Sequence, residues 1–536
     1  MKQFVAALIV LMLFSCGALA DEGHHHEDLT TDQLGTVHFP ISCATAVQKP
    51  FERGVALLHS FWYEEAEKEF EQIAKDDPRC AMAHWGIAMS IWHQLWNHPD
   101  AATVQRGQAE VKNAKSLHPK AGRERNYVAA MDAFYRGKKR DYQDRASAYS
   151  KAMESAYQSY PNDREAAAFY ALSLLASEPD NDTTFANRKQ AAAVLEKLFA
   201  VEPDHPGVAH YLIHSYDKPQ LAELGLPAAR RYAQIAPAAP HALHMPSHIF
   251  ARLGLWQDDI DSNLASIAAT RKTAAMHMGG EGHQFHAMDF LVYAYLQSGR
   301  EADAQKVIDE VKAMPAKKDN MYGMDFDPRT DALVTLSARY VLEMHHWADA
   351  ASLALVPDAE TADNSITYWA RAIGAARTGN VADARKDVAE IEAIHATLVE
   401  KKKKYFAEMV EQDRQEAAAW VAHAEGKNDE AIKALRTVAE KEEAEGDEPL
   451  AIPAREMLAD MMLDMNRPEQ ALAEYEADLK FNPNRFNGLY GAARAAEMAG
   501  KTQKSNTYYA RLVKVCDGSS SDRPELAHAK ALLAQR

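Results

Sequence analysis

The stretch GVALLHSFWYEEAEKEFEQIAKDDP, Gly54–Pro78, decides the fold of this 536-residue chain. Small residues at Gly54 and Ala66 allow two antiparallel helices to approach closely, and Phe70 is placed to fill the space between them. Pro78 has no backbone N–H to donate and therefore ends the second helix. The stretch predicts a helical hairpin. Its two helices are expected at about 47–60 and 64–76.

The same pattern returns along the chain. Ala88 stands 34 residues after Gly54, and His93 stands 34 residues after His59. Similar turns followed by a small residue occur at Gly299–Ala304, Gly379–Ala384, Gly426–Ala431 and Asn466–Ala471. No segment shows the sustained alternation that is typical of strands. Repetition at this interval predicts a solenoid of stacked helix pairs.

These motifs resemble the tetratricopeptide-repeat (TPR) superfamily. The stretches HFPISC (38–43) and HALHMPSHIF (241–250) also resemble uncharacterised exported bacterial TPR proteins. The resemblance implies an all-α fold, a right-handed superhelical solenoid of antiparallel helix pairs. It further implies that a protein or peptide segment binds in the concave groove, and it implies no particular enzyme.

The first twenty residues predict export. Lys2 is followed by the apolar run 4–14 and by a small-x-small cleavage site at 18–20, so residues 1–20 are expected to be a signal peptide. The alternative is a lipid anchor at Cys16. No later segment offers 18 apolar residues, so no membrane span is expected. The predicted location is periplasmic or secreted.

The rest of the chain divides by composition. We expect a mobile segment at 21–46, a solenoid with a histidine-rich groove at 47–311, an irregular linker at 312–330, and a second solenoid with a capping helix at 331–536. The formal net charge of −17 argues against a nucleic-acid partner, because contacts to the phosphate backbone need Lys and Arg.

The cysteines predict one disulfide bond. Cys43 precedes the first helix and Cys80 follows the first helical hairpin, so the two are expected to pair and to clip the amino-terminal end of the solenoid. An exported protein permits such a bond. Cys516 then remains unpaired.

Histidines follow the repeat through the middle of the chain. His210 and His244 are 34 residues apart, as are His214 and His248, so these pairs are expected at equivalent places on neighbouring helices. Spacings of three and four residues put each set on one helix face. By the TPR resemblance, these faces look into the concave groove.

Imidazoles from neighbouring helices can meet at one metal ion. One predicted site is all-imidazole, and a second is mixed, with a carboxylate. The expected ligands are His210, His214, His244 and His248 for the first and His241, His286 and Asp289 for the second. Zinc, copper or iron would suit such ligands. Two alternatives stand beside this: a groove that binds peptide without metal, and histidines that are purely structural.

Catalytic motifs are absent from the sequence. There is no phosphate-binding glycine loop, no nucleophile elbow and no His-Glu-x-x-His motif. The catalytic residues are therefore unknown. The sequence favours an exported binding scaffold, and the alternative is a metal-dependent enzyme with its ion held between residues 210 and 289.

Overall fold

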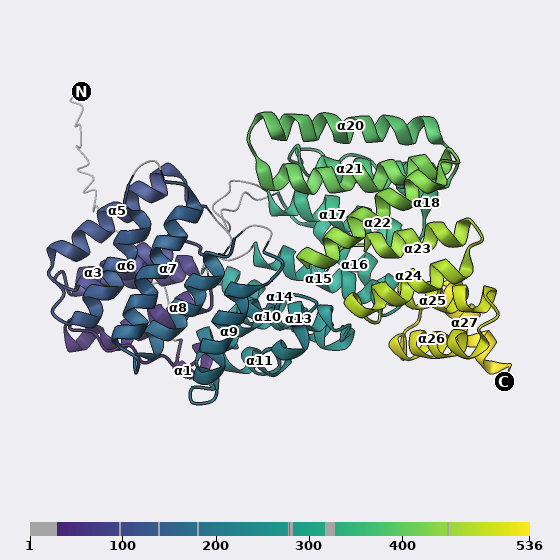
Figure 1. The fold of residues 1–536 in the computed structure, drawn as a ribbon. Coiled ribbons are helices and arrows are strands. Elements are labelled where there is room, and N and C mark those ends of the chain that lie inside the picture. The colour runs from purple at the N-terminus through teal and green to yellow at the C-terminus, as the bar shows by residue number, and fades with distance from the viewer. Residues whose placement is uncertain are drawn as a thin grey trace, which may run out of the picture.

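The computed structural model describes residues 29–95, 98–137, 140–179, 182–276, 278, 282–316, 327–446 and 450–535. The predicted signal peptide, including Cys16, lies outside these residues. No strand occurs in the part of the chain that is described, and its helices pack mainly on their neighbours in sequence. The expected all-α solenoid of antiparallel helix pairs is therefore confirmed, and Figure 1 shows it as an elongated molecule.

Three groups of helices follow one another along the molecule (Figure 1). The amino-terminal group, purple to blue, is α1 Thr31–Leu34, the 3-10 helix η2 Thr45–Val47, α2 Gln48–His59, α3 Tyr63–Asp76, α4 Ala81–Ser90, α5 Ala101–Ser116, α6 Gly122–Tyr135, α7 Tyr142–Ser159, α8 Arg164–Ala176 and α9 Ala186–Phe199. The middle group, teal, is α10 Pro206–Tyr216, α11 Ala222–Ile235, α12 Pro240–His244, α13 Pro246–Arg252, α14 Trp256–Ala275, α15 His283–Gln297 and α16 Glu301–Ala313.

The carboxy-terminal group, green to yellow, contains the two longest neighbouring helices, α20 and α21. The turn glycines on either side of this pair, Gly379 and Gly426, are 47 residues apart, which indicates long helices. The members of the group are α17 Pro328–Glu343, α18 Trp347–Ala351, α19 Asn364–Arg377, α20 Val381–Glu400, α21 Lys404–Ala424, α22 Asn428–Glu445, α23 Ala454–Asp464, α24 Pro468–Phe481, α25 Phe486–Met498, α26 Thr502–Val515 and α27 Pro524–Ala534. α27 packs on α26 at the end of the array, where a capping helix is expected.

The first hairpin forms as its sequence predicts. α2 and α3 pack together, and the ring of Phe70 is fully buried between α2 and α4. A Cβ atom added at Gly54 would lie 2.8 Å from Cζ of Phe70, so a larger residue would push the ring away. Close contact of the helices therefore depends on this glycine.

The amino-terminal segment is a correction to the sequence analysis. Residues 29–46 are not a mobile tail, because Leu34, Val37 and Phe39 are buried in the core of the first helices. The N–H of Thr36 also donates to the carbonyl of Asp204. Apolar side chains in a segment without helical periodicity contribute this packing. Residues 21–28 lie outside the described residues.

The predicted disulfide bond is present. Cys43 and Cys80 are joined, with their Cα atoms 4.9 Å apart, and Cys80 is the residue that precedes α4. The bond ties the amino-terminal segment to the second helix pair. Cys516 is a free and buried cysteine.

The predicted linker interrupts the helices but not the core. α16 ends at Ala313 and α17 begins at Pro328, and residues 317–326 are outside the described residues. Val311 on one side and Leu336 on the other belong to the same buried cluster. The segment 312–330 therefore does not separate two independent cores, because helices on both sides share one apolar interior.

The solenoid coils so that its carboxy-terminal part touches its middle. Nζ of Lys218 lies 2.6 Å from the carbonyl oxygen of Glu445, and Nε1 of Trp256 donates to the carbonyl of Asn484 over 2.8 Å. Contacts across more than 220 residues of sequence hold the coil closed. No described helix combines the length and the apolar character that crossing a membrane requires.

Candidate metal centre

Six histidines meet where the middle helices pack, and a seventh, His283 of α15, has its ring centroid 5.5 Å from that of His241. α10 carries two of the six, α12 two, and α13 and α15 one each: His210 and His214, His241 and His244, His248, and His286. The helix is interrupted at Met245, between α12 and α13, because Pro246 has no N–H to continue the hydrogen-bond pattern.

The histidines form two groups of three. In each group one ligand nitrogen per residue lies within 4.8 Å of the other two. We name them the first triad, which is His210, His214 and His241, and the second triad, which is His244, His248 and His286.

This grouping differs from the predicted one. The repeat register pairs His210 with His244, whereas in the structure His210 faces His241, one helical turn earlier. α12 is only five residues long before the break, so its side chains do not keep the register of an ideal repeat. Asp289 belongs to neither triad, because its carboxylate binds the guanidinium of Arg339. The predicted mixed site with Asp289 is therefore not assembled.

The first triad is built around His210. Its Nδ1 lies 2.6 Å from the carbonyl oxygen of His59, which can only accept a hydrogen bond. Nδ1 therefore carries the proton, and Nε2 of neutral His210 presents a lone pair. That nitrogen lies 3.1 Å from Nε2 of His241 and 3.0 Å from Nε2 of His214. Three ring nitrogens thus converge on one point.

In the second triad, the hydrogen bond to Asn263 determines which ring nitrogen of His244 carries the proton. The amide nitrogen of Asn263 donates to the carbonyl of Asp259 over 3.0 Å, so its oxygen faces His244. That oxygen accepts from Nδ1 of His244 over 2.7 Å. Nε2 of neutral His244 consequently carries a lone pair and no proton. It lies 3.0 Å from Nε2 of His248.

His248 is held in the same way by a carboxylate. Its Nδ1 lies 2.9 Å from Oδ2 of Asp217, and Oδ1 of Asp217 accepts from Arg252 over 2.8 Å. Although burial alone would raise it, Arg252 and His248 hold the pKa of Asp217 well below its usual range. A histidine whose Nδ1–H is bound by a carboxylate, with Nε2 left for an ion, is a common arrangement in metal sites.

Burial keeps most of these rings neutral. It lowers the pKa of His210 to about 3 and that of His286 to about 3. It also holds the pKa of His214, His241 and His244 well below the ordinary value, with neighbouring histidines adding to the effect. Neutral imidazole is the form that binds metal.

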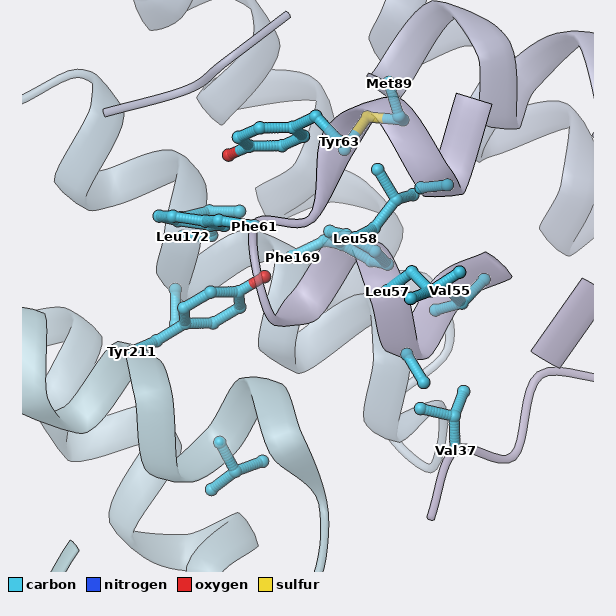
Figure 2. Close-up of a cluster of buried hydrophobic side chains, with 14 of the residues drawn as sticks. Val37, Val55, Leu57, Leu58, Phe61, Tyr63, Met89, Phe169, Leu172 and Tyr211 are labelled. Carbon is cyan, nitrogen blue, oxygen red and sulfur yellow. The ribbon is translucent and has the colours of Figure 1, made fainter. Parts of the chain in front are cut away.

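Each triad is covered by one phenylalanine ring. The centroid of Phe61 lies 4.3 Å from that of His210 and 5.6 Å from those of His214 and His241. Figure 2 shows the Phe61 ring between Tyr63 and Tyr211. Phe61 has a φ of 52°, which is uncommon for a residue with a side chain.

Phe290 covers the second triad in the same manner. Its centroid lies 4.9, 4.6 and 5.2 Å from those of His244, His248 and His286. The two triads therefore have separate apolar covers, one from the turn after α2 and one from α15. Such covers limit the access of water to a site.

The imidazoles do not line an open groove, which corrects that part of the expectation. His210 is 0% exposed and His244 is 2% exposed, while His214 and His286 are half-buried. The coil of the solenoid brings α2 and its following turn against α10 and thereby covers the first triad. A peptide cannot lie along rings that are enclosed in this way.

A further buried cluster was missed by the sequence analysis. Glu165 accepts from His59 over 2.8 Å and from His205 over 2.9 Å, and His59 Nδ1 lies 2.8 Å from the hydroxyl of Tyr211. Although burial opposes it, the two histidines hold the pKa of Glu165 well below its usual range. These groups satisfy one another, and the cluster fixes the His59 carbonyl that binds His210. No spacing in the sequence relates Glu165 to these partners.

The stacking of antiparallel helix pairs defines an all-α helical-repeat solenoid. No known family model and no curated protein matches the chain. Among solved structures, the human IFIT1 dimer with m7Gppp-AAAA is similar, with 13% identity, a TM-score of 0.35, and coverage of 86% of this chain and 95% of that one. A monomeric IFIT1 mutant with Gppp-AAAA has 12% identity, a TM-score of 0.36, and coverage of 92% and 100%. These values are too low to transfer a ligand to this chain.

Proposed function

We propose that this protein is a metal-binding helical scaffold, in which a transition metal is held by buried imidazoles. The observation that carries the proposal is the approach of Nε2 of His244 to Nε2 of His248, 3.0 Å apart. In both rings Nδ1–H donates a hydrogen bond elsewhere, from His244 to Asn263 and from His248 to Asp217. In neutral rings two lone pairs then face each other, and a cation between them turns this repulsion into attraction.

The ligand chemistry supports zinc, copper or iron. Neutral imidazole nitrogen suits all three metals, and Zn–N distances are about 2.0–2.1 Å. Two ligands at that distance in tetrahedral geometry are roughly 3.3 Å apart, close to the separations in both triads. A triad of imidazoles also leaves a coordination position for a further ligand.

Binding is favoured over catalysis by the surroundings of the second triad. A metal-dependent enzyme needs an open position and a nearby group that accepts a proton. The carboxylate in contact with this triad, Asp217, is already paired with Arg252. Recognition of a protein or peptide segment by the solenoid stays a prediction. Its binding surface would lie elsewhere than at the buried histidines.

We also propose that the protein works outside the cytoplasm. The Cys43–Cys80 disulfide supports this location, because such bonds persist in oxidising compartments. The leader-like sequence at residues 1–20 supports it as well. Detection of the protein in a periplasmic or culture-medium fraction, rather than in the cytoplasmic fraction, tests this.

Elemental analysis tests the metal proposal. Tag-free protein is purified after growth with zinc, copper and iron, dialysed, and analysed by inductively coupled plasma mass spectrometry. We expect bound metal in the wild type, a marked loss in the double variant His244→Ala/His248→Ala, and no loss in His84→Ala, whose ring pairs with Glu110 away from the triads.

The alternative occupant of the gap between His244 and His248 is a proton on one of the rings. The proposal would be contradicted if the protein sample contained no more metal than the dialysis buffer and took up none when zinc, copper or iron was added. Circular dichroism of each variant shows whether loss of metal reflects loss of the fold instead.

A further inference from the structure

The two triads share no ligand, and each is complete in itself. Each has three imidazoles with converging nitrogens, and each has its own hydrogen-bond anchors. The first is anchored by the carbonyl of His59, and the second by Asn263 and Asp217. A single ion bound in one triad would leave the other triad, with two buried rings and one half-buried ring, without an ion.

The triads are also close neighbours. His241 of the first and His244 of the second stand on the same short helix, α12, with ring centroids 6.2 Å apart. One turn of helix therefore separates the ligand sets. Ions in the two triads would therefore lie side by side, one under the ring of Phe61 and one under the ring of Phe290.

The charge of the groups around the two triads indicates which further ligand two ions would need. The six imidazoles contribute no negative charge to offset two divalent ions. Asp217 is shared with Arg252, and Asp289 is bound to Arg339. Two buried dications repel one another strongly unless an anion lies between them. An open coordination position on each ion is a place for such an anion.

Resting on the proposed function, we infer that the centre holds two metal ions, one in each triad, and binds a small anion such as hydroxide or azide between them. The paired ions share that anion through their open positions. Each triad has one half-buried ring, His214 in the first and His286 in the second, and these two rings mark the route of entry.

Stoichiometry tests the pair of ions. The metal-free full chain is titrated with Cu²⁺, and bound copper is counted by native mass spectrometry. We expect two ions in the wild type, one in His214→Ala, one in His286→Ala and two in His84→Ala. Both substituted ligands are half-buried, so these variants disturb the core less than changes at the other four histidines.

Outcomes separate this inference from the proposed function. One ion in the wild type and none in either triad variant means a single shared site, which overturns the pair but keeps the metal centre. No copper in the wild type overturns both. Two ions in the wild type that both vanish in one variant would also overturn independent triads.

Electron paramagnetic resonance tests the shared anion. With azide added, the two-copper wild type is expected to lose most of its Cu²⁺ signal, because bridged ions couple. His286→Ala, with one copper, is expected to keep its full signal under the same conditions. A full and unchanged signal from two coppers in the wild type, with or without azide, would show that no anion joins them.

Discussion

Arg485, at the start of α25, donates a hydrogen bond of 2.6 Å to the hydroxyl of Tyr293 in α15, 192 residues earlier in the chain. The same guanidinium lies 2.8 Å from Glu343 of α17 and 2.8 Å from Glu456 of α23. Its side chain is 0% exposed. One buried cation therefore joins four helices of the middle and carboxy-terminal groups.

Replacing this cation should weaken the closure of the coil. Arg485→Leu leaves Glu343 and Glu456 buried without their partner, so the free energy of unfolding should fall by about 3–5 kcal/mol. Urea denaturation measures it. The matched control is Arg230→Leu, whose pair with Asp258 is at the surface and is worth at most about 1 kcal/mol. Equal losses in the two variants would contradict a special role for Arg485.

The carboxylate behind His248 should tune metal affinity. In Asp217→Asn the ring loses its charged acceptor, so affinity for the second triad should drop by roughly 10–100-fold. Competition with a chelator of known affinity measures this. Asp289→Asn is the control, because that carboxylate binds Arg339 and touches neither triad, and its metal affinity should equal that of the wild type.

The phenylalanine covers should slow the release of metal. Phe61→Leu should speed release from the first triad, and Phe290→Leu from the second, each by roughly tenfold, because a smaller side chain admits water and chelator. Stopped-flow transfer to a chromogenic chelator resolves the two phases. Phe199→Leu, which alters a partly buried ring elsewhere in the amino-terminal core, should leave both rates unchanged. If all three variants accelerate both phases alike, the covers are not specific.

Buried Asp478 should make stability depend on pH. Burial above all, with Glu456 nearby, raises its pKa to about 8, and the residue is 1% exposed. The folded state therefore keeps a proton that the unfolded state releases near pH 4. This contribution to stability is fully present below pH 4 and is lost as the pH rises through 8, at up to about 1.4 kcal/mol per pH unit.

Asp478→Asn removes this titration. Between pH 5 and pH 8 the variant should lose less stability than the wild type, as measured from urea midpoints at both values. The exposed residue Asp429 provides the control, since Asp429→Asn should keep the wild-type slope. If the stability of Asp478→Asn fell more steeply between pH 5 and pH 8 than that of the wild type, the raised pKa of Asp478 would be refuted.

Much of the fold can be predicted because repeats carry local information. Gly54 and Phe70 define the first hairpin by size and spacing alone, and the Cys43–Cys80 bond follows from the order of helices around it. The exception is the segment before α2. Phe39 lies there in a stretch without helical periodicity, and only tertiary packing shows that it belongs to the core.

The spacing of the sequence singles out the six histidines of the triads but does not predict which of them meet. All six histidines of the triads stand out by their spacing on helices. Which of them meet depends on the break at Pro246 and on how α10 and α12 cross, and neither is encoded in a repeat interval. Asn263 comes from α14, which follows α13 in the chain, whereas Phe61 reaches the histidines because the coil of the solenoid brings α2 against α10.

The anchoring of His210 by the carbonyl of His59 spans 151 residues. A growing chain cannot present a complete centre until α15 has emerged and α2 has docked against α10. An ion bound by the proposed centre would therefore be selected in the compartment where folding finishes. For a protein that crosses a membrane before it folds, the metals present on the far side would select the occupant, whatever the cytoplasm contains.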